Sequence, residues 1–63
     1  MKLNLPHILI VDDDKKILEL VNDYLIKNNF RVSTAINALK AREKIENIEF
    51  DLIILDIMMP GES

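Results

Sequence analysis

Two short aliphatic runs that each end in aspartate restrict the fold of this chain more than any other feature. Residues 8–11 (ILIV) lead into the acidic triplet at 12–14, and residues 52–55 (LIIL) lead into Asp56. Because a half-buried strand alternates apolar and polar residues, an unbroken apolar run predicts a strand buried on both faces of an α/β sheet. A carboxylate at the end of such a strand is costly unless a cation or hydrogen bonds compensate its charge. These aspartates are therefore candidate site residues.

Apolar spacing after the first run predicts a helix. From Lys15 onward one helical face carries Ile17, Leu18, Val21, Tyr24 and Leu25. Asp14 is the expected N-cap, since its carboxylate suits the free amides at a helix start. Asn28 and Asn29 are expected to end the helix, because asparagine tolerates the left-handed conformation of a C-terminal cap.

The middle of the chain predicts a second strand and a second helix. Residues 30–35 (FRVSTA) alternate as a more exposed edge strand does. Asn37 is the expected cap of the following helix. The narrow apolar stripe of that helix contains Ala38, Ala41, Ile45 and Ile48. Residues 1–7 are expected to form a disordered lead in which His7 is a surface side chain.

This alternation of strand, helix, strand, helix, strand predicts parallel strands joined by right-handed crossovers. Ligands of such sheets bind at the carboxyl ends of the strands, where strand order reverses. If the first and third strands are neighbours, Asp12 or Asp13 meets Asp56 at one edge.

Composition narrows the class of protein. The chain has 63 residues, 49% hydrophobic and 30% charged, with a net charge of -3, which predicts one small globular domain. It has no cysteine, so disulfides and cysteine-ligated metals are excluded. No basic patch indicates nucleic-acid binding by this segment, and no apolar run is long enough to predict membrane insertion. We expect a cytoplasmic protein.

Converging carboxylates repel one another unless a cation lies between them. Oxygen ligands favour a hard divalent ion, and Mg²⁺ accepts a few carboxylates while it keeps its waters. Mg²⁺ commonly assists phosphoryl transfer, and a carboxylate can itself become the nucleophile.

The motifs ILIVDDD and DLIILDIMMPG resemble those of the receiver domain of two-component response regulators. The MMPGES ending is most similar to the OmpR-type transcription factors, and the likeness runs from about His7 to Glu62. The resemblance implies a flavodoxin-like, doubly wound parallel sheet with strand order 2-1-3, of which residues 8–63 form the N-terminal (βα)₂β half.

The same resemblance implies roles for Asp12, Asp13 and Asp56, whereas we keep Asp14 as a helix cap. Asp56 matches the phosphoacceptor that takes phosphate from a sensor histidine kinase. Asp13 would bind Mg²⁺ directly and Asp12 through water, with Asp56 and the backbone carbonyl of Met58 as further ligands. The resemblance thus implies a signalling acceptor rather than an enzyme, and no catalytic residue is assigned.

The family's remaining switch residues, a Ser or Thr after strand four and a Lys after strand five, are not among these 63 residues. We therefore expect a truncated receiver that does not switch alone. Its third strand would be an uncharged open edge, which favours self-association or pairing with the missing receiver half. We expect the isolated chain to be unfolded, aggregated or dimeric rather than a stable monomer.

Other interpretations of these residues are open. Capping and turn formation alone explain an acidic triplet or a strand-ending aspartate. A non-catalytic interaction fragment or gene remnant, pairing through the third strand, is one alternative function. A Mg²⁺-dependent aspartyl phosphatase is a weaker one, because such enzymes usually carry a second Asp two residues after the nucleophile, where this chain has Met58.

Overall fold

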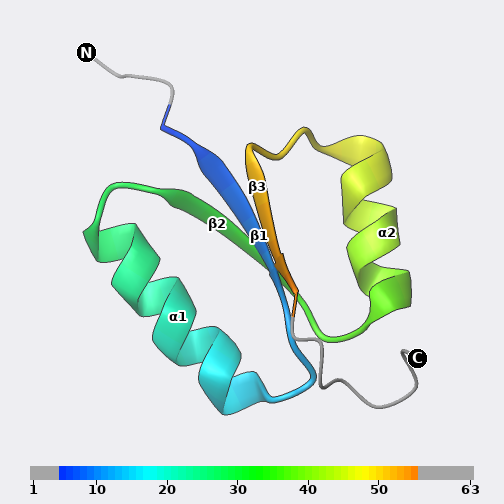
Figure 1. Ribbon diagram of the computed structural model, residues 1–63, viewed down its shortest axis with the longest axis horizontal. Helices are drawn as coiled ribbons and strands as arrows, with labels where there is room; N and C mark the ends of the chain where they lie inside the picture. Colours follow the sequence, from blue (N-terminus) through cyan, green and yellow to red (C-terminus); the bar gives the residue numbers. More distant parts are fainter. Residues whose placement is uncertain (1–4, 56–63) are drawn as a thin grey trace.

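A three-stranded parallel sheet lies between two helices in the computed structural model, which describes residues 5–55 (Figure 1). The elements are β1 (His7–Val11), α1 (Lys15–Lys27), β2 (Arg31–Ala35), α2 (Ala38–Asn47) and β3 (Leu52–Leu55). The strand order is β2-β1-β3, and β1 pairs in parallel with both neighbours. The predicted α/β class and the order 2-1-3 are therefore confirmed.

β1 is the centre of the sheet. Ile8 pairs with Val32 on one side and with Leu52 on the other, and this register continues to the end of the strand. Neighbours on both edges and a helix over each face leave residues 8–11 no more than 3% exposed. The first aliphatic run is thus the fully buried strand that its sequence predicts.

The helices divide the apolar side chains of β1 into two cores. On the α1 face Ile8, Ile10 and Leu18 are buried, with Val21 and Leu25 packed against them. On the α2 face the buried cluster is formed by Leu9, Val11, Ala35 and Ala41, with Phe50 packed against it. Because Ala41 has only a methyl group, α2 can approach the sheet closely.

The ends of α1 follow from their capping residues. The carboxylate of Asp14 accepts hydrogen bonds from the amides of Lys16 and Ile17, which lack partners within the helix. Asn28 is the C-cap, and Asn29 follows it with a φ of 70°. A left-handed residue after the cap reverses the chain, and asparagine adopts this conformation more readily than most residues.

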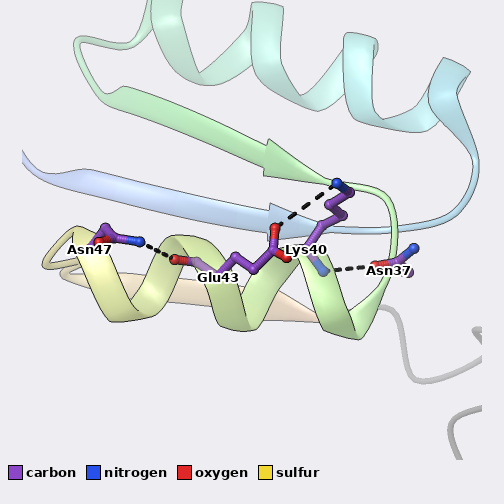
Figure 2. Close-up of polar contacts among 4 residues, drawn as sticks. All are labelled: Asn37, Lys40, Glu43 and Asn47. Atoms are coloured by element: carbon purple, nitrogen blue, oxygen red, sulfur yellow. Dashed lines mark hydrogen bonds and ion pairs between the residues drawn. The ribbon is translucent and has the colours of Figure 1, made fainter.

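Polar contacts along α2 also begin at its cap. Figure 2 shows the Asn37 side chain accepting a hydrogen bond from the Lys40 amide at 2.8 Å. The Lys40 ammonium also lies 3.9 Å from the carboxylate of Glu43 in the next turn. The side-chain amide of Asn47 donates to the backbone carbonyl of Glu43. The ion pair is solvent-exposed, so it contributes at most about 0.5 kcal/mol.

Some boundaries and exposures differ from the sequence predictions. β1 begins at His7, which belongs to the predicted lead, because Asp51 binds both the amide and the carbonyl of His7. Arg31 likewise bonds to the carbonyls of Leu5 and Pro6. β2 begins at Arg31 rather than at residue 30.

Two apolar segments are more exposed than their patterns predict. Ile17 and Tyr24 are 42% and 66% exposed, because α1 packs on β1 and β2 through Leu18 and its neighbours. All four residues of β3 are exposed, since among the described strands β3 has a neighbour on one side only. The described helices include none long and apolar enough to cross a membrane.

Candidate functional site

The carboxyl ends of β1 and β3 lie side by side at one end of the sheet. Val11 pairs with Leu55 on one side and with Ala35 on the other, so all three strands end in line. Asp12 is the residue that follows Val11. Ligands of doubly wound sheets bind at this end, beside the carboxyl end of the central strand.

Asp12 is the one buried charged residue in residues 5–55, with 6% of its surface exposed. Its amide donates to the carbonyl of Ala35 at 3.1 Å, which extends the pairing of β1 with β2 by one bond. Its Oδ1 accepts a hydrogen bond from the Asp14 amide at 2.9 Å. The carboxylate is thus held by the backbone of the turn that leads into α1.

Asp13 and Asp14 have different surroundings although they are adjacent. The Asp14 carboxylate caps α1, with Oδ1 lying 2.9 Å from the amide nitrogen of Lys16. Asp13 is solvent-exposed between two residues that are both held by hydrogen bonds. Asp13 therefore has its carboxylate accessible to an ion, whereas Asp14 has a structural role.

The donor atoms at this edge suit a hard cation. Asp12 and Asp13 carry carboxylate oxygens, the type of donor that hard divalent cations such as Mg²⁺ and Ca²⁺ prefer. Within residues 5–55 no group of three acidic or histidine side chains is arranged to hold a metal. The other predicted ligands, Asp56 and the Met58 carbonyl, lie outside the described residues, as does the MMPGES ending.

Comparison with known families identifies this arrangement. Residues 8–63 match the model of the response regulator receiver domain. The chain belongs to this family. Its strand order and the position of its acidic turn after the central strand are those expected of a receiver.

Curated relatives of this receiver chain include proteins that are named as regulatory proteins. It is 48% identical over 62 residues to the protein PetR of Rhodobacter capsulatus and 50% identical over 56 residues to the regulatory protein VanR of Enterococcus faecium. It is 41% identical over 58 residues to the transcriptional regulatory protein ResD of Bacillus subtilis. These matches cover 89% to 98% of the chain.

The receiver chain spans about a quarter of the length of these relatives, between 24% and 26%. No solved structure matches the chain. The relatives named as regulators support a place in signalling and transcription regulation for the family to which this chain belongs.

One feature of the site is absent from the sequence predictions. The hydrogen bond from the Asp14 amide to Asp12 makes the first aspartate of the triplet part of the turn itself. The signal for this contact was the spacing, because an Asp side chain commonly accepts from the amide two residues further on. The triplet thus combines a turn residue, an exposed carboxylate and a helix cap.

At the other end of the strands, His7 makes two contacts that the sequence does not predict. His7 Nε2 lies 2.9 Å from the hydroxyl of Ser33, and its ring contacts Phe50 edge-on at 4.7 Å. His7, predicted to be a surface side chain, is thus a part-buried residue that connects β1, β2 and the loop before β3.

Proposed function

We propose that this receiver chain accepts a phosphoryl group on Asp56 from a phosphohistidine of a sensor histidine kinase, with Mg²⁺ bound at the same edge. The observation that carries the proposal is the parallel pairing of Val11 with Leu55. These two residues immediately precede Asp12 and Asp56 in the chain. Family membership supports the same assignment.

The transfer exchanges one bond for another. A carboxylate oxygen of Asp56 attacks the phosphorus atom in line with the bond to the imidazole of the donor. The new oxygen–phosphorus bond forms as the nitrogen–phosphorus bond breaks, and the electron pair of that bond returns to the imidazole nitrogen, which takes up a proton. The product is an aspartyl phosphate and a free histidine.

Mg²⁺ would neutralise the charge that the carboxylates and the phosphoryl oxygens bring together. Asp13 is the direct carboxylate ligand in this proposal, which agrees with its exposure. Asp12 acts through water, and its hydrogen bond from the Asp14 amide orients it. Asp56 and the carbonyl of Met58 complete the protein ligands.

The chain is proposed as an OmpR-like signalling acceptor of the cytoplasm rather than as an enzyme. Relatives named as regulatory and transcriptional regulatory proteins support this reading, as does the MMPGES ending. The partner of this segment is then a kinase. Binding to nucleic acid is assigned to a separate output domain and not to this segment.

Phosphorylation of the 63-residue chain by a small donor tests the proposal. The chain is first checked for folding by circular dichroism and is then incubated with acetyl phosphate and Mg²⁺. An acid-stable and base-labile phosphoryl label is expected, and chelation of Mg²⁺ should prevent it. Asp56→Asn should remove the label, whereas Asp23→Asn, at an exposed position on α1, should retain it. A label that persists in Asp56→Asn refutes the assignment.

A further inference from the structure

Ala35, the last residue of β2, is bound to the buried aspartate of the candidate site. Its carbonyl accepts a hydrogen bond of 3.1 Å from the amide of Asp12. The carboxylate of Asp12 is held separately, by the amide of Asp14. Asp12 therefore has two backbone anchors, one supplied by β2 and one by the turn that leads into α1.

The side chain of Ala35 is buried where β2 meets α2. Only 3% of Ala35 is exposed, and it shares the buried cluster on the α2 face with Leu9, Val11 and Ala41. Ala41 belongs to α2 and is 5% exposed. β1 supplies the two larger side chains of this cluster, whereas β2 and α2 each supply only a methyl group. The two alanines therefore let α2 lie close to the end of β2.

Alanine at position 35 does not follow from the requirements of a strand. β-Branched residues fit strands better than alanine does, and β2 carries such residues at Val32 and Thr34. A residue that strand propensity disfavours indicates a constraint of another kind. The constraint at this position is the space left by α2, which packs on both β1 and β2.

The connection between β2 and α2 is too short to absorb a movement of the helix. β2 ends at Ala35 and α2 begins at Ala38, so only two residues join them (Figure 1). One of these, Asn37, is fixed to the first turn of α2 through its side chain and its carbonyl. A larger side chain at position 35 would push α2 and the end of β2 apart. The carbonyl of Ala35 would then move relative to the amide of Asp12.

We propose that Ala35 is a positioning residue for the Mg²⁺ site, because its small side chain sets the place of the carbonyl that holds Asp12. This inference rests on the proposed function, in which Asp12 acts on the metal ion through water. Groups beyond the direct ligands orient the atoms around a metal ion, and their loss weakens metal binding. Ala35 has no polar side-chain atom and acts only through Asp12.

Hydrogen exchange measured by NMR tests the first step, which is the effect of side-chain size at position 35 on the Asp12 amide. The amide of Ile10, two residues earlier in β1, points to the same neighbouring strand and is the internal reference. Global unfolding accelerates both amides alike, so the ratio of their rates reports a local change. In Ala35→Val, exchange at Asp12 should accelerate relative to Ile10 by roughly tenfold.

Ala35→Ser is the conservative variant, since it adds a single atom to the buried methyl group. Its ratio of exchange rates should lie between those of the wild type and Ala35→Val. If Ala35→Val does not fold, the ratio in Ala35→Ser decides. A ratio that stays at the wild-type value in the folded variants overturns the proposal.

Titration calorimetry with Mg²⁺ tests the second step. Ala35→Val should bind Mg²⁺ roughly 3–10-fold more weakly, a smaller loss than removal of an outer-shell ligand causes. Val32→Ala is the matched control, because Val32 packs against the cluster on the α1 face and its truncation weakens the fold away from Ala35. This control should keep the Mg²⁺ affinity of the wild type. Unchanged affinity in Ala35→Val, or an equal loss in folded Val32→Ala, contradicts the positioning role.

Asp13→Asn separates this inference from the proposed function. Asp13 is the direct carboxylate ligand in that proposal, so Asp13→Asn should lose Mg²⁺ affinity whatever residue stands at position 35. If Asp13→Asn binds Mg²⁺ as the wild type does, the proposed metal site fails and the positioning role fails with it. If Asp13→Asn loses affinity while Ala35→Val keeps it, the metal site stands and only the role of Ala35 is refuted.

Discussion

The amide of Asp14 donates a 2.9 Å hydrogen bond to Oδ1 of Asp12, so the cap of α1 and the buried carboxylate after β1 belong to one turn. The sequence DDD presents three similar acids, but their roles divide by geometry. Asp12 is buried, Asp13 is exposed, and the Asp14 side chain is bound to the start of α1. Substitutions at these positions should therefore have different consequences.

Two changes at Asp12 should separate its charge from its part in the turn. Asp12→Asn keeps an oxygen that accepts from the Asp14 amide, so the free energy of unfolding should change by less than about 0.5 kcal/mol. Its Mg²⁺ affinity, measured by titration calorimetry, should fall roughly 10–100-fold, the usual effect of losing an outer-shell ligand. Asp12→Ala should in addition lose about 1 kcal/mol of stability. Unchanged Mg²⁺ affinity in Asp12→Asn would remove Asp12 from the proposed site.

The Asp14 side chain should affect stability rather than metal binding. Asp14→Ala leaves two amides of α1 without their side-chain acceptor and should cost about 1 kcal/mol in urea unfolding. Asp14→Ser, which keeps a capping oxygen, is the matched control and should lose much less. If Asp14→Ala abolishes Mg²⁺ binding while the chain stays folded, Asp14 is a ligand and not only a cap.

Asn29 should respond to substitution through its backbone conformation. Its φ of 70° is unfavourable for a residue with a Cβ atom, although asparagine tolerates it better than most. Asn29→Ala should destabilise the fold by about 1 kcal/mol, whereas Asn29→Gly should be neutral or stabilising. Urea denaturation distinguishes the two variants. A more stable Asn29→Ala than Asn29→Gly would be inconsistent with this turn.

A pair of leucine substitutions should measure how strongly the fold depends on β1. Leu9 is fully buried at the centre of the sheet, whereas Leu20 is 70% exposed on α1. Leu9→Ala should cost about 2–5 kcal/mol, which is comparable to the whole stability of a domain of this size. Circular dichroism should therefore show an unfolded chain for Leu9→Ala and nearly wild-type signal for Leu20→Ala. Similar melts for both variants would show that the core lies elsewhere.

Short sequence patterns predict most of the helices and strands of this fold, because neighbouring side chains determine where each of them begins and ends. The apolar run at residues 8–11 is the buried central strand, and the caps at Asn37 and Asn28 lie where side-chain chemistry indicates. Exposure is less predictable, because it depends on what lies opposite a residue. Leu52–Leu55 is as aliphatic as residues 8–11, yet it is exposed. Its sequence does not indicate that β3 pairs with only one of the described strands, whereas β1 pairs with two.

In the candidate site, too, some features can be predicted from the sequence and others cannot. The sequence alone indicates that acidic residues follow two aliphatic strands, and the register of β1 with β3 brings the carboxyl ends of those strands together. The hydrogen bond within the acidic turn and the position of His7 against Ser33 depend on tertiary contacts. No short sequence motif indicates which of these residues form a contact.

Chemical location of the phosphoryl group on the 63-residue chain is the most direct test of its proposed role. After reaction with acetyl phosphate and Mg²⁺, borohydride reduction converts an aspartyl phosphate to homoserine, and mass spectrometry of the peptides locates that change. We expect conversion at position 56 alone, dependent on Mg²⁺ and reduced by Asp13→Asn. Conversion at position 12 or 13 instead, or a folded chain that is never phosphorylated, would contradict it.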